Sequence, residues 1–235
     1  QFNNLMTQFY KDYNTSIKEI ETFIGNLDFI KSCAKASNKL NYVRPNIKST
    51  DKISYVKCEE LRHPIIERIN NTMYVPNWVR LGVQVESDKL YDNNNRKYIS
   101  DDPQMDGMLL FSCNSLGKSS YMKSVGLSVI LAQMGMFVPA KKFNYYPFRN
   151  LMTRIIGNDN MHKGQSSFAV EMSELRGIIN RADKYTLVLG DEVCHGTEQN
   201  SGIALVATTL KWLASKNVKY IFATHLHQLS RMNEI

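Results

Sequence analysis

The sequence has few cysteines and no long apolar run. Its four cysteines are far apart and never form a C-x-x-C pair; they are Cys33, Cys58, Cys113 and Cys194. This spacing favours reduced thiols in an intracellular protein over disulfides or a thiolate zinc site. No apolar segment approaches the roughly 18 residues that span a membrane, and no secretory signal opens the chain. We therefore expect a soluble intracellular protein.

The composition is that of a globular α/β protein with a basic half. Of the 235 residues, 43% are hydrophobic and 22% are charged, which suffices for one large core. The formal net charge is +7, and the basic excess lies in the second half. Five bases there are set against the single acid Asp159: Lys141, Lys142, Arg149, Arg154 and Lys163. Such a group either faces a polyanion or, more commonly, forms a solvated face.

The N-terminal part has the periodicity of a long helix. Apolar residues recur every three or four positions from Leu5 to about Ser37, which predicts one buried stripe. Gly25 is a candidate break, and Pro45 ends the helical pattern. Because the sequence starts inside this pattern at Gln1 and stops just after a predicted strand, we expect a piece of a longer protein.

Two domains follow from this pattern. Residues 1–45 are expected to form a helical connector, and residues 46–235 an α/β domain. Early strands are predicted at 52–58 and 79–85. The polar segment 86–107 is interpreted as a loop or flexible insertion.

A phosphate-binding loop is the strongest local motif. The apolar run Met108 to Phe111 leads into small polar residues and Gly117-Lys118-Ser119, and an amphipathic helix begins at Ser120. A strand, loop and helix in this order aim backbone N–H groups and the helix dipole at phosphate oxygens, with the lysine on the β- and γ-phosphates and a hydroxyl on Mg²⁺. Ser112 replaces the first glycine of G-x-x-x-x-G-K-[ST], so the motif is incomplete.

Later elements are predicted from apolar periodicity. Helices are expected at 119–134, 168–182 and 201–215, and a strand at 151–156. The first of these helices is expected to bury five apolar side chains: Met122, Val125, Val129, Ile130 and Met134.

Two further apolar runs end in polar residues. One starts at Thr186 and leads into Asp191-Glu192, and the other starts at Tyr220 and leads to His225. Carboxyl ends of parallel strands share one edge of a sheet, so these side chains are expected near the phosphate loop. An aspartate suits Mg²⁺, and a second acid can activate water. His225 is either a satisfied core histidine or a γ-phosphate contact, and its neighbours favour the latter.

Blocks across the whole chain match one family in order. They include His63-Pro64, Tyr74-Val75-Pro76-Asn77, Asn114 with Gly117-Lys118-Ser119, Gly164 to Phe168, Val170-Glu171-Met172, Asp191-Glu192 and Ala223-Thr224-His225. The sequence resembles the C-terminal ATPase domain of MutS-type DNA mismatch repair proteins, which are similar to ABC-class ATPases. This resemblance implies an α/β P-loop NTPase fold with a mixed or parallel central sheet, flanking helices and an N-terminal helical segment.

The resemblance also implies roles for individual residues. Tyr74 would stack on adenine with Val75 beside it, although Tyr74 also fits an ordinary core position. The phosphates of ATP or ADP would be held by the loop residues Asn114, Ser115, Leu116, Gly117, Lys118, Ser119 and Ser120. Ser119 and Asp191 would hold Mg²⁺. Ser166 would reach the nucleotide of a partner subunit, although it also fits a helix N-cap.

Catalysis would then fall to Glu192, His225 and Lys118. Glu192 would polarise the attacking water, and His225 would sense the γ-phosphate. The implied function is ATP hydrolysis coupled to homodimerisation through the ATPase domains and to a DNA clamp built from upstream segments. The resemblance implies no membrane as a partner. No zinc is expected either, because Cys194, His195, His225 and His227 lack the usual ligand spacing.

Departures from the family pattern carry further expectations. Ser112, Cys113, Ser115 and Leu116 replace four loop residues, and a serine at a left-handed position costs roughly 1–2 kcal/mol. His195 stands where the family has an arginine. Ser112 and His195 favour, as an alternative, a nucleotide-binding dimerisation switch with little hydrolysis. Another ABC-like DNA repair or recombination ATPase is a further alternative within the same fold. Asn114-Ser115, Cys194 and Glu198 resemble the giant-virus and coral-mitochondrial branch, which implies a viral or cytoplasmic location or, alternatively, a mitochondrial one.

Overall fold

The computed structural model describes most of the chain and contains two compact units, Gln1–Tyr42 and Val43–Ile235. The described residues are 2–47, 53–69, 74–82, 90–91, 97–98, 105–111, 116–155, 167–194 and 198–232. Residues Ser112 to Ser115, Ser166 and His195 lie outside them, so the predictions made for these positions stay predictions.

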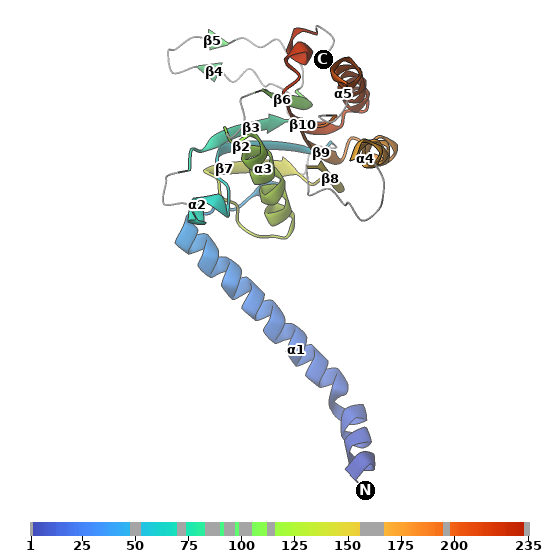
Figure 1. Ribbon diagram of the computed structural model, residues 1–235. Helices are drawn as coiled ribbons and strands as arrows, with labels where there is room; N and C mark the ends of the chain where they lie inside the picture. The colour runs from blue at the N-terminus through green and yellow to red at the C-terminus, as the bar shows by residue number, and fades with distance from the viewer. Residues whose placement is uncertain are drawn as a thin grey trace. The chain divides into compact units, whose positions relative to one another are not determined.

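The first unit is one uninterrupted helix, α1 (Phe2–Leu40) (Figure 1). It is longer than predicted, and it passes through Gly25, so the predicted break there is wrong. A glycine inside a helix costs only about 1 kcal/mol, which a 39-residue helix tolerates. The apolar stripe is exposed rather than buried in the described chain, with Ile17 49% and Ile24 57% accessible. The periodicity therefore predicted the helix correctly, but the predicted burial of its apolar stripe is not seen in the described chain.

The second unit begins with a mixed four-stranded sheet. Its strands, in the spatial order β1-β7-β2-β3, are β1 (Asn46–Ile47), β7 (Lys142–Tyr146), β2 (Tyr55–Leu61) and β3 (Asn77–Leu81). β2 runs antiparallel to β3 and β7, and β1 runs parallel to β7. The short helix α2 (Ile66–Ile69) follows β2. β2 starts three residues later than predicted and β3 two residues earlier, and β7 was not predicted.

A second sheet is entirely parallel. Its strands, in the spatial order β6-β10-β9-β8, are β6 (Gly107–Phe111), β10 (Lys219–Thr224), β9 (Thr186–Asp191) and β8 (Asn150–Arg154). Strand side chains alternate between two cores. Leu189 and Ile221 pack with α3 (Lys118–Gln133) and the first sheet. Val188 and Phe222 pack with α4 (Ser167–Arg181) and α5 (Gln199–Ser215). The predicted α/β class with mixed and parallel sheets is confirmed.

Helix α3 packs closely on β9. Met122, Val125 and Val129 are buried as predicted. Ile130 and Met134 are 42% and 54% exposed, so their predicted burial is wrong. The buried positions follow a spacing of three and four, and Ile130 lies about 100° around the helix from Val129. A side chain on Gly126 would come within 2.8 Å of Leu189, so this glycine permits the close approach.

The predicted polar loop 86–107 contains regular structure. β4 (Leu90–Tyr91) and β5 (Lys97–Tyr98) form a short antiparallel pair, and β6 starts at Gly107. The loop prediction is therefore wrong at these positions. The last described element is the 3₁₀ helix η2 (His227–Arg231). None of the described helices is long and apolar enough to cross a membrane.

A buried ion pair lies where β6 and β10 begin. Lys219 is fully buried, and its Nζ lies 2.9 Å from Oδ1 of Asp106. The same ammonium donates to the backbone oxygen of Asn217 at 2.6 Å. Gly82, at φ 73°, leaves the space that the Lys219 side chain occupies, and any Cβ there would collide with it. The lysine is therefore part of the packing that joins β3, β6 and β10.

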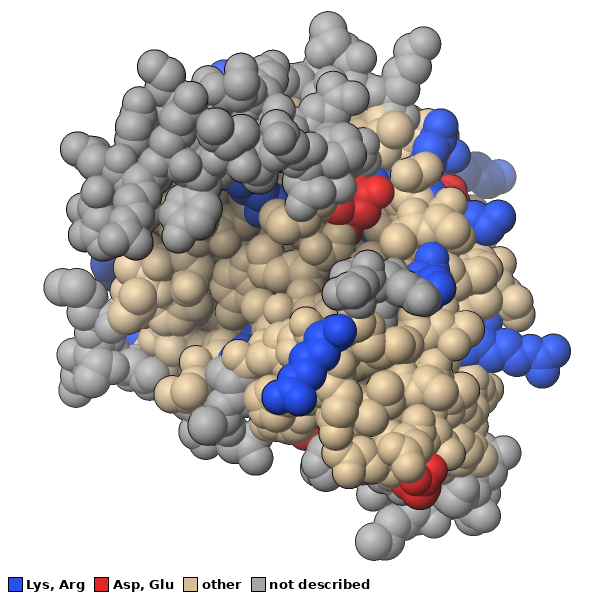
Figure 2. Space-filling view, turned by 90° about the horizontal axis from the view of Figure 1, so that it is seen from above, with Lys and Arg blue, Asp and Glu red and all other residues tan. Residues whose placement is uncertain are grey.

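Three of the five bases grouped around Asp159 in the sequence contact other side chains of the fold, and Lys163 lies outside the described residues. Lys141 contacts Glu60 at 2.7 Å, Arg154 lies 3.0 Å from Glu174, and Arg149 stacks 4.2 Å over the Tyr185 ring. On the face seen in Figure 2 the described Lys and Arg side chains do not merge into one patch. This arrangement favours the solvated, structural interpretation over a polyanion-binding surface.

Candidate active site

The strand register places the predicted catalytic segments at one edge of the parallel sheet. Ala223 of β10 lies opposite Leu110 of β6 and opposite Asp191 of β9. Beyond these pairs β6 continues toward the phosphate loop, β10 toward His225 and β9 toward Glu192. The carboxyl ends of parallel strands are where such folds bind ligands.

Three of the predicted residues form one polar cluster. His225 Nε2 lies 2.7 Å from Glu192 Oε1 and 3.4 Å from Lys118 Nζ. An ionised carboxylate only accepts hydrogen bonds, so we assign the Nε2 proton to the bond with Glu192. The His225 and Glu192 side chains are 28% and 22% exposed, which leaves the cluster open to a ligand. The structure thus brings together all three predicted catalytic side chains.

Asp191 has an unused acceptor beside this cluster. The residue is 7% exposed, and its Oδ1 has no hydrogen-bond partner in the described structure. A buried carboxylate oxygen without a partner is costly unless a cation or water satisfies it. Ser119, partly buried in the first turn of α3, offers a hydroxyl oxygen. An aspartate and a hydroxyl suit Mg²⁺, which usually keeps several waters and phosphate oxygens as its other ligands.

No comparable case exists for zinc among the described residues. They contain no group of three or more His, Cys, Asp or Glu side chains arranged to hold a metal ion. Burial, reinforced by the Glu171 carboxylate, raises the pKa of Cys194 to about 11. The thiol therefore stays protonated at neutral pH in the metal-free protein.

A cavity of about 690 Å³ adjoins the cluster and shares Lys118 with it. Tyr74 and Val75 line one side, and Leu116, Gly117, Lys118 and Ser120 line another. Gly117 adopts φ 90° as the N-cap of α3, a conformation that suits glycine. The first-turn N–H groups of a helix lack intrahelical acceptors, so this end of α3 can hold an anion.

Sequence reasoning missed part of the cavity wall. Ile66, Trp78 and Tyr121 also line it. The Tyr121 hydroxyl donates to the Trp78 backbone oxygen at 3.0 Å and thereby joins α3 to β3. In the sequence, the one indication that Trp78 belongs to this wall was its position four residues after Tyr74.

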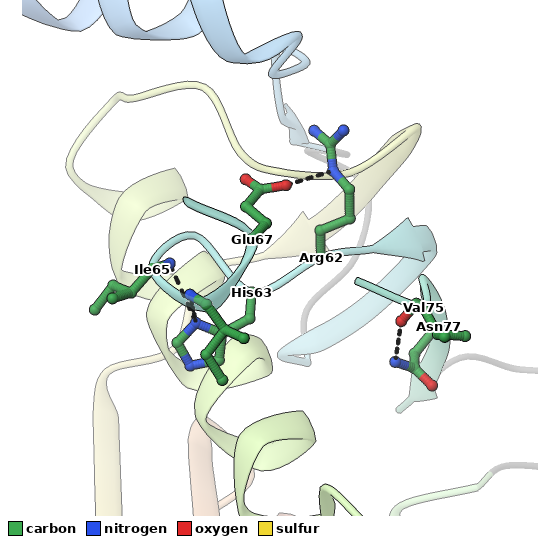
Figure 3. A network of polar contacts seen from close by, with 7 residues as sticks. Arg62, His63, Ile65, Glu67, Val75 and Asn77 are labelled. Carbon is green, nitrogen blue, oxygen red and sulfur yellow. Dashed lines mark hydrogen bonds and ion pairs between the residues drawn. The ribbon is translucent and has the colours of Figure 1, made fainter. Parts of the chain in front are cut away.

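His63 lies beside Tyr74, a residue of the cavity wall, and Figure 3 shows this histidine with its contact to Ile65. Its Nδ1 accepts the N–H groups of Ile65 and Ile66, both at 3.2 Å, and so fixes the turn into α2. The His63 and Tyr74 ring centroids are 6.5 Å apart. Burial lowers the pKa of His63, which keeps the imidazole neutral and able to accept.

Two further contacts lie close to these residues. Arg62 Nε lies 3.2 Å from Glu67 Oε2, across the turn into α2. Asn77 Nδ2 donates to the Val75 backbone oxygen at 3.0 Å (Figure 3). The second contact joins two residues that line the cavity.

Acidification is expected to destabilise the fold through His63. The folded-state pKa is lowered from 6.5, so below about pH 6.5 the unfolded chain binds more protons than the folded chain. The stabilisation is complete above this pH and is lost as the pH falls through it toward the folded pKa. His63→Asn keeps an acceptor that cannot titrate, so its Tm should fall less than that of wild type between about pH 7.5 and 5.5. Equal falls in thermal melts would contradict this role.

Comparison with known proteins identifies the family. Residues 108–235 match the family model for MutS domain V. The whole chain is 40% identical to a mutS homolog of Acanthamoeba polyphaga mimivirus and covers 22% of that protein. It is 35% identical over 97% of its length to the mitochondrial DNA mismatch repair protein mutS homolog of Sarcophyton glaucum, covering 21% of it.

A bacterial relative is similar over the same extent. The DNA mismatch repair protein MutS of Alkaliphilus oremlandii is 32% identical over 97% of the chain, which covers 24% of that protein. The chain thus spans about a fifth to a quarter of the length of these relatives. The resemblance to giant-virus and coral-mitochondrial proteins is confirmed. The chain belongs to the MutS family.

Proposed function

We propose that this chain is a P-loop ATPase domain that binds ATP with Mg²⁺ and hydrolyses it at the carboxyl edge of the parallel sheet. The observation that carries the proposal is the contact chain Lys118–His225–Glu192, at 3.4 and 2.7 Å, beside a cavity that shares Lys118. The cavity volume of about 690 Å³ falls in the range of small-molecule sites. Tyr74 and Val75 would bind the base, and the N-terminus of α3 would bind the phosphates.

Each residue of the cluster has a distinct task in hydrolysis. Glu192 orients and polarises a water whose oxygen bonds to the γ-phosphorus while the bond to the β–γ bridging oxygen breaks, giving ADP and phosphate. Lys118 places positive charge where the phosphate oxygens gain negative charge. His225 would sense the γ-phosphate by turning its Nε2 proton from Glu192 to a γ-phosphate oxygen. Mg²⁺, held by Ser119 and Asp191, would neutralise charge on the β- and γ-phosphates.

Dimerisation and DNA coupling form the wider part of the proposal. Ser166, one residue before α4, is proposed to contact the nucleotide of a partner subunit, so that two copies complete each site. Because the chain covers less than a quarter of the relatives above, DNA would be held by segments outside it. Nucleotide state would then set the affinity of two copies for each other and, through them, the state of a DNA clamp.

A second function is favoured by the loop sequence. Leu116 stands at a glycine position of the family loop and is 71% exposed at the cavity. Together with Ser112, it motivates a nucleotide-binding dimerisation switch with little hydrolysis. Both functions require nucleotide binding, and they differ in whether ATP is hydrolysed.

Nucleotide binding is expected to change the emission of Trp78. This residue lines the cavity, and the other tryptophan, Trp212 on α5, is partly buried in the opposite core, so Trp212→Phe removes the background. Titration with Mg·ATP should give a saturable change. Lys118→Ala should weaken binding about 10- to 100-fold, as expected for loss of a charge-assisted contact.

Lys123→Ala is the matched control for that titration. Lys123 is an exposed residue of the same helix and does not line the cavity. Its variant should bind Mg·ATP as wild type does. No emission change at millimolar nucleotide, or equal affinities for the Lys118 and Lys123 variants, would refute a nucleotide site here.

A further inference from the structure

Glu171 is a buried acid that the proposed chemistry does not use. It lies in the second turn of α4, and only 5% of its surface is exposed. Its Oε1 accepts the backbone N–H of Cys194 at 2.8 Å. The Arg154 Nη2 lies 3.7 Å from the same oxygen. A carboxylate from one helix thus holds the backbone of the loop that follows β9.

That loop carries Glu192 in an unusual conformation. Glu192 and Cys194 both have positive φ, at 49° and 63°, although neither is glycine. Such residues persist only where surrounding contacts hold them. Two hydrogen bonds flank the turn: Glu192 N–H donates to the Ala223 oxygen at 2.9 Å, and Cys194 N–H donates to Glu171. The first bond is backbone to backbone, so the second is the one that a side chain controls.

We propose that Glu171 is a positioning residue that fixes the left-handed loop after β9 and thereby aims the Glu192 carboxylate at His225. Val193 and Cys194 are 3% and 2% exposed, so water cannot readily replace Glu171 as the acceptor for the Cys194 N–H. Without that acceptor the loop can relax from its positive-φ conformation, and the carboxylate moves with it. The proposal rests on the hydrolytic function proposed above and extends it to a residue outside the site.

Glu174 provides a matched control on the same helix. It lies 3.0 Å from Arg154, closer than Glu171 does, but its side chain is 48% exposed and no contact joins it to the loop in the described structure. Loss of charge near Arg154 is therefore common to changes at both positions. Loss of the hydrogen bond to Cys194 is specific to Glu171.

The test compares Glu171→Met, Glu171→Gln, Glu171→Asp and Glu174→Met in ATP hydrolysis and in Trp78-detected nucleotide binding. Glu171→Met removes the acceptor at similar length, and it should lower kcat about 10- to 100-fold while changing Kd less than about threefold, because misplacing a reacting group by about 1 Å has effects of this size. Glu171→Gln keeps an amide oxygen as acceptor and should restore kcat to within about threefold of wild type. Glu174→Met should match wild type.

Several outcomes would overturn the proposal. Glu171→Met with wild-type kcat would do so, and so would equal losses in Glu171→Met and Glu174→Met. If Glu171→Met does not fold, Glu171→Asp decides: it keeps the charge but is too short to reach the Cys194 N–H, so wild-type kcat in this variant would refute the idea. Wild-type protein without hydrolysis would overturn the proposed function and this inference together, whereas hydrolysing wild type with unaffected Glu171 variants would overturn the inference alone.

Discussion

Glu192→Gln is expected to lower the kcat of ATP hydrolysis by about 10²- to 10⁴-fold while leaving nucleotide affinity within a few-fold of wild type. The amide has the shape of the carboxylate, and its oxygen can still accept from His225 Nε2, which lies 2.7 Å away in the wild-type structure. It cannot, however, polarise water as a charged base does. Steady-state phosphate release at saturating Mg·ATP measures kcat, and Trp78 emission measures binding.

The control for this change is another acid in the same unit. Glu174→Gln removes a carboxylate charge from α4, away from the cluster, and should hydrolyse ATP at the wild-type rate. If Glu192→Gln also kept the wild-type rate, Glu192 would not be the hydrolytic base. If it lost binding together with turnover, its role would be in holding the site rather than in the chemistry.

Asp106→Asn is expected to reduce the free energy of unfolding by about 3–5 kcal/mol. It leaves the Lys219 ammonium, which is fully buried, without its carboxylate at 2.9 Å. Breaking a buried ion pair is costly because the remaining charge stays desolvated. The double variant Asp106→Asn with Lys219→Met removes that stranded charge, and it should recover a large part of the lost stability. Denaturant unfolding followed by far-UV circular dichroism gives the free energies.

A surface ion pair calibrates this measurement. Lys141 and Glu60 are also in contact, at 2.7 Å, but their side chains are 66% and 43% exposed. Lys141→Met should therefore cost far less free energy of unfolding than Asp106→Asn does. A cost for Asp106→Asn no larger than that of Lys141→Met would show that the buried pair does not contribute as the structure suggests.

The parallel sheet and the edge that carries the candidate site were predictable because buried parallel strands have a plain signature. β9 and β10 are short apolar runs between turns, and each leads directly into the polar side chains of the site. Because both strands were expected in one parallel sheet, the sequence also predicted that Glu192 and His225 lie at the same edge. What the sequence could not provide was the 2.7 Å contact between them, which depends on the left-handed turn at Glu192.

Elements without such a signature were missed. In β7, Phe143, Asn144 and Tyr145 are all buried, so there is no alternation of polar and apolar positions to detect. Trp78 and Tyr121 meet across 43 residues of sequence, and only the tertiary fold makes them neighbours. Lys219 opens an otherwise apolar strand, and nothing local indicates that Asp106 neutralises it.

In the α1 helix, apolar periodicity predicted the element but not the burial of its side chains. Its repeat of apolar residues correctly indicated a helix, yet these side chains are exposed in the described chain. Periodicity reports which face of a helix is apolar and not what packs on it. The predictions for Asn114, Ser115 and Ser166 likewise depend on segments outside the described residues.

Phosphate release from Mg·ATP, followed across a range of protein concentrations for wild type and for Glu192→Gln, decides whether this chain is an ATPase. We expect Mg²⁺-dependent release by wild type, with a rate per subunit that rises as two copies associate and complete each site, and release near background for the variant. Wild-type release no faster than that of Glu192→Gln at every concentration would refute hydrolysis at this site and leave this chain a nucleotide-binding switch at most.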